Sequence, residues 1–340
     1  MWKIGDLSLD GRVVLGPMSG FTFRSYREFM RPFGIGLSTT EMVSSMAILH
    51  SNPRTLDYLD LGRDRPVAVQ LFGGDLDAVE RAAHRVVKLD PTVDMIDLNM
   101  GCPVAKVVRN GAGSAMMREP AKCGEMVRRV KRASGLPVSA KIRLGWNHDS
   151  INHMDVIREI QDAGVDAITI HPRTRTEGYA GTPHYDLVEG LRDVMSVPLI
   201  ISGNIYTLDD AVRAREVTGA DAVMVARGGV GNPYLVTQID TYLRTGERLP
   251  NPFISQQVDW CIQLMDMVLE EFGEERAMAK LRSIVPRFIS GCWNCRDLRR
   301  TLSSCEVRNR EAVVRILEEV DSEMGHKRVN SYARPAGCDE

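Results

Sequence analysis

Short apolar runs recur along this chain, and each is followed by a turn and then by a stretch whose apolar residues have helical spacing. We expect strands in eight of these runs, at residues 13–15, 36–39, 67–71, 95–98, 138–142, 167–170, 199–201 and 222–225. Amphipathic helices are expected between them, for example at 76–88, 123–133, 154–162 and 208–217. Strands that are apolar almost throughout and alternate with helices are typical of a parallel sheet that is covered on both faces.

Eight such βα units over about 230 residues favour an α/β fold of the (β/α)8 TIM-barrel type, which usually has ~250 residues. An open, doubly wound sheet is the alternative, but no G-x-G-x-x-G follows the first expected strand to support it. We therefore assign residues 1–243 to a catalytic barrel domain. The GERLPNP stretch at 246–252 is typical of a linker. Helical spacing beyond it predicts a small helical domain at 252–322, and we expect a mobile tail at 323–340.

The 340-residue chain has a net charge of only −2, so any surface for RNA has to be local. Its seven cysteines are odd in number and do not form the disulfide framework of a secreted protein. The first residues lack the basic and apolar regions of a signal peptide, and no apolar run approaches the ~20 residues that span a bilayer. We therefore expect a cytoplasmic protein with no membrane partner.

The motif DLNMGCP at residues 97–103 places Cys102 in a turn directly after the fourth expected strand. A free cysteine is most often a buried core residue. Here Gly101 and Pro103 flank it and favour an exposed turn, and loops after parallel strands carry the reactive groups of α/β enzymes. We therefore assign a chemical role to Cys102.

Polar groups follow nearly every expected strand, at the ends where barrel enzymes gather their catalytic residues. In strand order these positions hold Pro17, Met18 and Ser19, then Glu41, Gln70, Asn99 with Cys102, Lys141 with Arg143, His171 with Arg173, Ser202 with Gly203 and Asn204, and Ala226 with Arg227. The glycine-rich backbone after the last two strands can offer N–H donors to a phosphate, and Arg227 would add charge. Structural roles are the alternative: the glycines could form tight turns, Lys141 could pair with a carboxylate, and His171 could be a core residue. Taken together, the set favours a site for a phosphorylated ring cofactor.

On these residues the chain resembles the tRNA-dihydrouridine synthases, in particular the bacterial B type. The matching segments are GPM at 16–18, VQLFG at 69–73, LNMGCP at 98–103, GAGSA at 111–115, KIRLGW at 141–146, HPRTR at 171–175 and ARG at 226–228. The resemblance covers about residues 4–320 and implies an FMN-containing barrel with a helical C-terminal domain. It further implies that NADPH or NADH reduces the FMN, which then delivers hydride to C6 of a uracil base while Cys102 protonates C5.

The resemblance also implies a role for each residue of the site. Cys102 is the catalytic residue, and Asn99, Arg143 and Arg173 bind the substrate. The residues that bind the cofactor are Pro17, Met18, Ser19, Gln70, Lys141, His171, Ser202, Gly203, Asn204, Ala226 and Arg227. The chain departs from the usual family pattern at Ser202-Gly203-Asn204, Pro172 and Ala226. A free thiol has a pKa of about 8.5, so a protonated Cys102 at neutral pH agrees with the role of an acid.

Basic residues gather in the expected helical domain, where a tRNA would need a docking surface. They are Arg276, Lys280, Arg282, Arg287, Arg296, Arg299, Arg300, Arg308, Arg310 and Arg315, opposed between 276 and 315 by Asp297, Glu306 and Glu311. Charge alone is equally typical of a solvated helix face, but a barrel that acts on a base favours RNA docking. We expect a monomer, although no pattern in the chain determines the oligomeric state.

No metal site is predicted. The CWNC motif at 292–295, with Cys305 nearby and Cys261 as a conceivable fourth ligand, is interpreted as structural thiols ahead of a zinc or iron–sulfur site. Three other functions stay open. They are an FMN-barrel oxidoreductase acting on a small pyrimidine, a flavin-dependent enzyme that modifies rRNA or methylates RNA, and a non-catalytic RNA-binding barrel.

Overall fold

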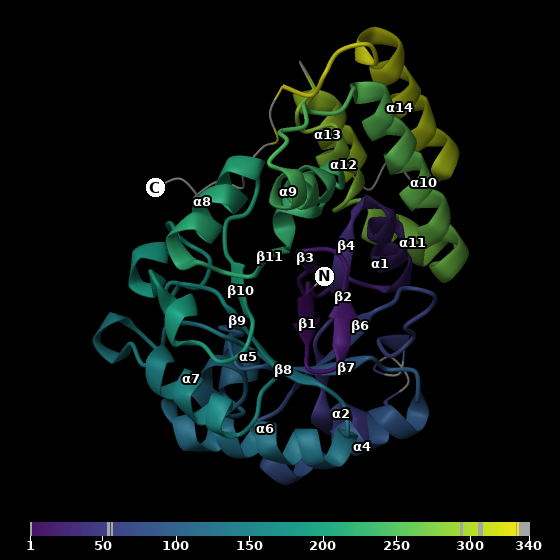
Figure 1. The fold of residues 1–340 in the computed structure, drawn as a ribbon. Helices are drawn as coiled ribbons and strands as arrows, with labels where there is room; N and C mark the ends of the chain where they lie inside the picture. The colour runs from purple at the N-terminus through teal and green to yellow at the C-terminus, as the bar shows by residue number, and fades with distance from the viewer. Residues whose placement is uncertain are drawn as a thin grey trace.

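Eight parallel strands close into a barrel in the computed structural model, which describes residues 2–52, 55, 57–292, 295–304, 309–330 and 332 (Figure 1). The strands are β3 (Val13–Leu15), β4 (Ile35–Thr39), β6 (Val67–Phe72), β7 (Met95–Asn99), β8 (Val138–Ile142), β9 (Ala167–Ile170), β10 (Leu199–Ser202) and β11 (Ala222–Val225). Strand β11 pairs with β3 and β4 pairs with β6, which completes the ring. The short β5 (Val43–Ser44) adds to β6. The expected barrel is confirmed, and an open sheet is excluded.

Helices surround the ring of strands (Figure 1). They are α1 (Arg24–Met30), α2 (Ser45–Leu49), α4 (Leu76–Leu89), α5 (Ala105–Val108), α6 (Pro120–Ser134), α7 (His153–Asp162), α8 (Leu208–Thr218) and α9 (Tyr234–Thr245). Side chains cap three of these helix starts, since Ser44 accepts the N–H of Ala47, Asp75 that of Ala78 and Thr207 that of Asp210. Gly135 and Gly219 end α6 and α8 in the left-handed conformation that a glycine adopts without strain.

The interior of the barrel is divided into an apolar and a polar half. Alternate strand residues, among them Val14, Ala68, Met95 and Ala222, pack in one cluster with Trp2, Ile4 and Leu9. These last three belong to the hairpin of β1 (Trp2–Ile4) and β2 (Leu7–Leu9), which lies across the middle of the ring (Figure 1). The next inward positions toward the strand ends are polar. Because the N-terminal half is filled, a ligand can enter only from the C-terminal end.

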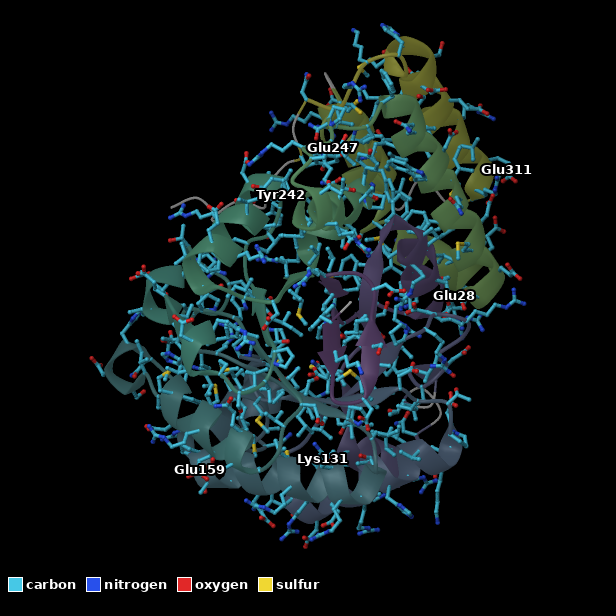
Figure 2. The ribbon with its side chains drawn as sticks, viewed as in Figure 1. Glu28, Lys131, Glu159, Tyr242, Glu247 and Glu311 are labelled. Carbon is cyan, nitrogen blue, oxygen red and sulfur yellow. The ribbon has the colours of Figure 1, made fainter. Side chains whose placement is uncertain are left out.

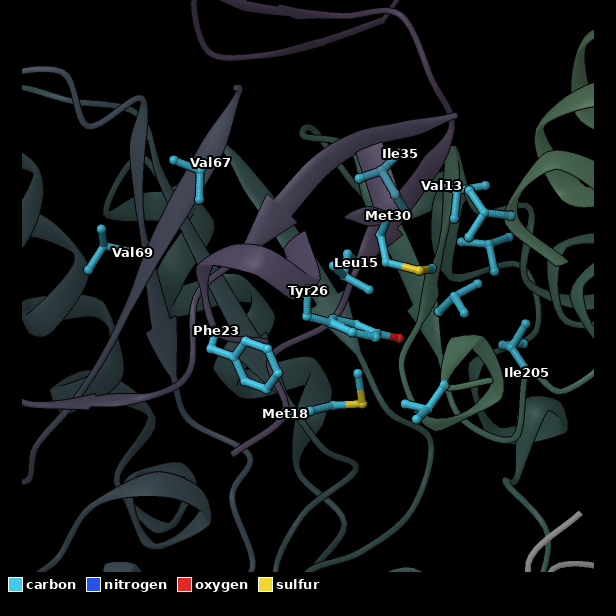
Figure 3. Close-up of a cluster of buried hydrophobic side chains, with 14 of the residues drawn as sticks. Val13, Leu15, Met18, Phe23, Tyr26, Met30, Ile35, Val67, Val69 and Ile205 are labelled. Atoms are coloured by element: carbon cyan, nitrogen blue, oxygen red, sulfur yellow. The ribbon is translucent and has the colours of Figure 1, made fainter. Parts of the chain in front are cut away.

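Helix α1 connects the barrel to the C-terminal helices. Tyr26 and Met30 of α1 lie against Leu15 of β3 in the buried cluster of Figure 3. At the start of the same helix, Phe23 packs edge-on against Phe272 with ring centroids 5.3 Å apart. The C-terminal helices are α10 (Ile254–Phe272), α11 (Glu274–Leu281), α12 (Val285–Phe288), α13 (Arg296–Ser303) and α14 (Arg310–Met324). Aromatic contacts thus fix this helical region against the barrel.

The tail at 323–340 was expected to be mobile, but its first part is held against the rest of the protein. Residues 323 and 324 still belong to α14, and Val329 is buried. Its N–H donates to Pro252 O at 3.0 Å, and Ile254 N–H donates to Lys327 O at 2.9 Å. The chain after α14 therefore pairs with the linker before α10. Residues 331 and 333–340 lie outside the described part.

Charged side chains lie at the outer edge of the molecule, as Glu159 and Glu311 do in Figure 2. Within the described residues, no helix combines the length and the apolar character needed to cross a membrane.

Replacing Ile4 tests whether the hairpin stabilises the barrel from within. Ile4 is fully buried against the inner strand residues, so Ile4→Ala should lower the free energy of unfolding by about 2–5 kcal/mol. Lys3 on the same strand is exposed, and Lys3→Ala should change it by less than about 0.5 kcal/mol. Denaturant-induced unfolding measures both variants. Equal midpoints for the two would show that the hairpin contributes nothing.

Candidate active site

A cavity of about 360 Å³ opens at the C-terminal ends of the strands. Each of the eight barrel strands, or the loop that follows it, contributes to the wall, and Arg287 of α12 contributes from the helical region. The wall includes nearly every residue that the sequence predicts for the site: Pro17, Met18, Ser19, Gln70, Asn99, Cys102, Lys141, Arg143, His171, Ser202, Gly203, Asn204, Ala226 and Arg227. The fold therefore brings together groups that are up to 210 residues apart in the chain (Pro17 to Arg227).

The turn that carries Cys102 is held by hydrogen bonds at both ends. The side-chain oxygen of Asn99 accepts the N–H groups of Gly101 at 3.2 Å and of Cys102 at 2.9 Å. The carbonyl of Cys102 accepts the N–H and the hydroxyl of Ser114, at 3.1 and 2.9 Å. Three of these bonds fix the backbone of Cys102, and the fourth fixes that of Gly101.

Asn99 is itself oriented by a buried chain of polar side chains across three strands. Its amide N–H donates to the Gln70 carbonyl at 2.9 Å. The Gln70 amide donates to Asp97 Oδ2 at 2.6 Å, and the Ser139 hydroxyl donates to Asp97 Oδ1 at 2.5 Å. The strand register explains this chain, because Asp97 lies opposite both Gln70 and Ser139. Since a carboxylate only accepts, it forces the Gln70 amide toward itself and the Gln70 carbonyl toward Asn99.

The Asp97 carboxylate and the Lys141 ammonium are both buried inside the barrel and attract each other. Burial raises the pKa of Asp97 to about 6, although Gln70, Ser139 and Lys141 lower it. Burial lowers the pKa of Lys141 to about 8, as does Arg143, whereas Asp97 raises it. Both groups are thus charged near neutral pH. The Lys141 ammonium lines the cavity and has no hydrogen-bond acceptor among the described residues, which leaves it to bind an electron-rich ligand atom.

The Cys102 thiol is held in its protonated form. Partial burial raises its pKa. A hydrogen bond from the backbone N–H of Val104 and the positive charges of Arg143 and Lys141 oppose this rise. At neutral pH the group is therefore a proton donor rather than a thiolate nucleophile. The nearby cations would nevertheless stabilise the thiolate that forms when the proton leaves.

His171 is neutral and has a defined tautomer. Burial lowers its pKa well below the usual value, and four cations around it act in the same direction. Arg173 lies within hydrogen-bond distance of its Nε2, at 3.0 Å. Because a guanidinium only donates, Nε2 accepts and Nδ1 carries the proton. The imidazole is thus available as a neutral N–H donor.

Two of the predicted strand-end residues do not line the cavity. Arg173, which the resemblance assigns to the substrate, is fully buried and also donates to Ala180 O at 2.9 Å and to Asn204 Oδ1 at 3.2 Å. It thus holds His171 and the loop after β9. Glu41 is buried as well and accepts the N–H of Gly20, so it supports the loop after β3.

Tyr179 is a residue of the cavity wall that the sequence reasoning missed. About half of it is exposed, and its ring lies 5.3 Å from the guanidinium of Arg143 and 5.1 Å from that of Arg227. Arg143 also donates to Gly101 O at 2.8 Å and to Thr174 O at 2.9 Å, so it joins the Cys102 turn to the Tyr179 loop. An aromatic residue directly after Gly178 in a long loop was the only signal for it.

The loops after β10 and β11 approach each other closely. A Cβ at Gly228 would overlap the carbonyl oxygen of Ile205, and one at Gly203 would lie 3.0 Å from His171 Cδ2. Gly203 has a φ of +120°, and Asn204 follows in the left-handed region with a φ of +45°. Only glycine therefore fits at positions 228 and 203. The closely packed backbone, the Ser202 hydroxyl and Arg227 form a donor set that suits a phosphate.

A groove of about 620 Å³ adjoins the cavity and shares Tyr206, Arg227 and Arg287 with its wall. It runs along the helical region, and its described lining holds no acidic residue. Its arginines are Arg227, Arg282, Arg287, Arg296, Arg299 and Arg300. Of the other predicted basic residues, Arg310 forms an ion pair with Asp266 at 2.6 Å, and Arg308 lies outside the described residues.

The cysteines of the CWNC motif lie apart from the cavity. Cys292 and Cys295 interact with each other, and Cys261 is buried. In the described part of the chain they gather no third metal-ligating side chain. Cys305 is outside that part.

The family model and the curated relatives agree on one family. A family model described as dihydrouridine synthase (Dus) matches residues 14–324. The chain is 34% identical over 298 residues to tRNA-dihydrouridine synthase B of Pseudomonas aeruginosa, covering 87% of this chain and 89% of the relative. It is 40% identical over 228 residues to a probable tRNA-dihydrouridine synthase of Rhizobium leguminosarum, covering 67% and 71%. Among solved structures, histamine dehydrogenase from Rhizobium sp. 4-9 has a TM-score of 0.53 at 14% identity, over 78% of this chain and 50% of that one, which shows a shared fold.

The protonation state of Cys102 can be measured by alkylation. Because burial raises its pKa, the rate of reaction with iodoacetamide should rise with pH with a midpoint above the ~8.5 of a free thiol. Lys141→Met removes a cation that stabilises the thiolate, so it should move the midpoint further up. Mass spectrometry of the alkylated peptide, with Cys102→Ser as the blank, follows the site. A midpoint below about 8 would contradict the assignment of an acid.

Proposed function

Because the chain belongs to the dihydrouridine synthase family, we propose that it reduces a uridine of tRNA to 5,6-dihydrouridine with FMN as its cofactor. One observation carries this proposal. Cys102, whose thiol is protonated and whose backbone is fixed by three hydrogen bonds, lines a cavity that adjoins an arginine-lined groove. The thiol suits the addition of a proton to a carbon atom, and the groove suits a polyanion.

The residues of the cavity fit FMN. The Lys141 ammonium lacks an acceptor among the described residues and would meet the electron-rich edge of the flavin ring. Gln70 and His171 add amide and N–H groups, and Pro17, Met18 and Ser19 would lie along the ring. The donors of Ser202, Gly203, Asn204, Ala226 and Arg227 would hold the ribityl phosphate. When bound, FMN supplies the transfer of a hydride from NAD(P)H to C6 of the uracil.

Cys102 completes the reduction of the double bond. Its S–H bond breaks as a C–H bond forms at C5, so hydride and proton together add the two hydrogens of the product. The thiolate left behind faces the backbone N–H of Val104 and the cations Arg143 and Lys141, which stabilise it until it takes up a proton from solvent. Burial keeps the thiol protonated before the step.

Asn99 and Arg143 would orient the base. One amide N–H of Asn99 is bound to Gln70, and the other has only the weak contact with Met42 Sδ, at 3.8 Å, among the described residues. That second N–H can donate to a uracil carbonyl in place of the contact with Met42. Arg173 acts as a positioning residue, because it fixes the tautomer of His171 from behind the wall.

The substrate base has to leave its stack to reach a site inside a barrel. The groove can hold the RNA on both sides of such a base, since its arginines run from Arg227 at the cavity to Arg300 on α13. A free pyrimidine would leave this groove without a role, which favours tRNA over a small-molecule substrate.

The finer features of the proposal follow the family expectation. NADPH rather than NADH serves as the reductant, and the protein acts in the cytoplasm. We also propose a monomer. The exposed apolar side chains Met46, Leu89, Met154 and Val194 lie on separate elements, as single apolar residues on monomeric proteins do.

The role of Cys102 is tested with purified protein, FMN, NADPH and tRNA that lacks dihydrouridine. Cys102→Ala should bind FMN as the wild type does and form dihydrouridine at least 100-fold more slowly, because it lacks the proton donor. Cys292→Ala changes a half-buried cysteine outside the cavity and should keep full activity. Nucleoside mass spectrometry measures the product. Full turnover by Cys102→Ala would exclude this cysteine as the acid.

The groove is tested by the salt dependence of tRNA binding. Arg299→Ala removes a groove cation, so the slope of log affinity against log salt should become shallower by about 0.7–1. Arg310 already pairs with Asp266, so Arg310→Ala should leave the slope unchanged. Filter binding at several salt concentrations measures both. Equal slopes for wild type and Arg299→Ala would place the RNA elsewhere.

A further inference from the structure

Two histidines and a glutamate meet outside the cavity, where the loops after β8 and β9 touch. His148 comes from the first loop, and Glu177 and His184 come from the second. Glu177 Oε1 lies 2.6 Å from His184 Nε2 and 3.4 Å from His148 Nε2. All three ligand atoms lie within 4.8 Å of one another. His148 lies 29 residues before Glu177 and 36 before His184, so no spacing pattern indicates the cluster.

The geometry is close to that of a tetrahedral metal site. The two imidazole rings are nearly perpendicular, at 89°, with centroids 5.2 Å apart, and both direct Nε2 to the same carboxylate oxygen. Zinc bonds to nitrogen and oxygen of about 2.0–2.2 Å place neighbouring ligand atoms about 3.4 Å apart. The His148–Glu177 distance already has this value. Shifts of roughly 1 Å in partly exposed side chains would bring the other pairs to it.

The carboxylate is fixed in a way that suits a ligand. Glu177 Oε2 accepts the N–H of Thr174 at 2.6 Å and its hydroxyl at 2.8 Å, which leaves Oε1 to face the histidines. Hydrogen bonds of this kind orient metal-binding carboxylates in proteins. Burial raises the pKa of Glu177, but the hydrogen bonds from Thr174 and His184 outweigh this and lower it to about 2.

We propose that His148, Glu177 and His184 bind a divalent transition-metal ion, in the first place zinc, with water as the remaining ligand. Two imidazoles and one carboxylate form a ligand set that zinc uses, whereas magnesium and calcium prefer oxygen ligands alone. The two histidines are partly exposed, with 56% and 32% of their side chains accessible, so a metal ion can enter from solvent.

A metal ion here would join two loops of the catalytic face. The loop that contains Glu177 and His184 also carries Tyr179 of the cavity wall. The loop that contains His148 carries Trp146, whose ring lies 4.7 Å from the guanidinium of Arg175 in the other loop. The ion would therefore add a coordinate bond to an existing contact and hold Tyr179 in place over the cavity.

Zinc binding to the full-length chain tests the proposal without any activity measurement. The protein is stripped with EDTA and dialysed against ZnCl2, and the bound metal is counted by mass spectrometry. His148→Ala, Glu177→Gln and His184→Ala should each bind one zinc ion less per chain than wild type, or bind it at least 10-fold more weakly. His84→Ala changes an exposed histidine on α4 and should bind as wild type does. This difference is independent of any zinc held by the CWNC cysteines.

Thermal unfolding provides a second measurement. ZnCl2 should raise the melting temperature of wild type and of His84→Ala more than that of the three variants, and MgCl2 should raise none of them. A zinc content and a zinc affinity both equal to those of wild type in any of the three variants would overturn the three-ligand site. Absence of zinc from the wild type would also overturn it and would leave a histidine–glutamate ion pair.

Discussion

The Asp97 carboxylate, buried inside the barrel, is the group on which the geometry of the site depends. Its two oxygens accept hydrogen bonds from Gln70 and Ser139, and this fixes which way the Gln70 amide faces. Gln70 in turn orients Asn99, which holds the turn of Cys102. The same negative charge lies near the Lys141 ammonium and keeps its pKa, lowered by burial, at about 8. A buried charge is tolerated only where hydrogen bonds and an opposite charge compensate it, and here those partners are the residues of the site.

The barrel provides this arrangement because its interior has two halves. The hairpin at residues 2–9 fills the N-terminal half with Trp2, Ile4 and Leu9, so the inward positions there are apolar. The polar inward residues are thereby confined to the C-terminal half, next to the loops that carry Cys102 and Tyr179. The helical region packs against the start of α1 and borders the loops after β10 and β11, which brings its arginines to the edge of the cavity. The hairpin that completes the core thus also determines at which end of the barrel the site lies.

Much of this was predictable from the sequence. All eight barrel strands begin and end within one residue of expectation, because short apolar runs before a turn leave little freedom of register. The sequence did not predict the features that depend on contacts between distant segments of the chain. Arg173 follows a strand, as the other predicted site residues do, yet its side chain lies behind the cavity wall. Tyr179 and the cluster around Glu177 depend on how two loops meet. Val329 is buried where its backbone pairs with the linker before α10.

The central claim is that this chain forms dihydrouridine in tRNA, and a gain of product tests it most directly. The chain is expressed in a bacterium whose own dihydrouridine synthase genes have been deleted, and its tRNA is digested and mapped for dihydrouridine by mass spectrometry. The account predicts that dihydrouridine reappears at a defined position of the tRNA. If every tRNA position stayed unmodified while the folded, flavin-bound protein accumulated in the cells, the assignment to tRNA would be contradicted.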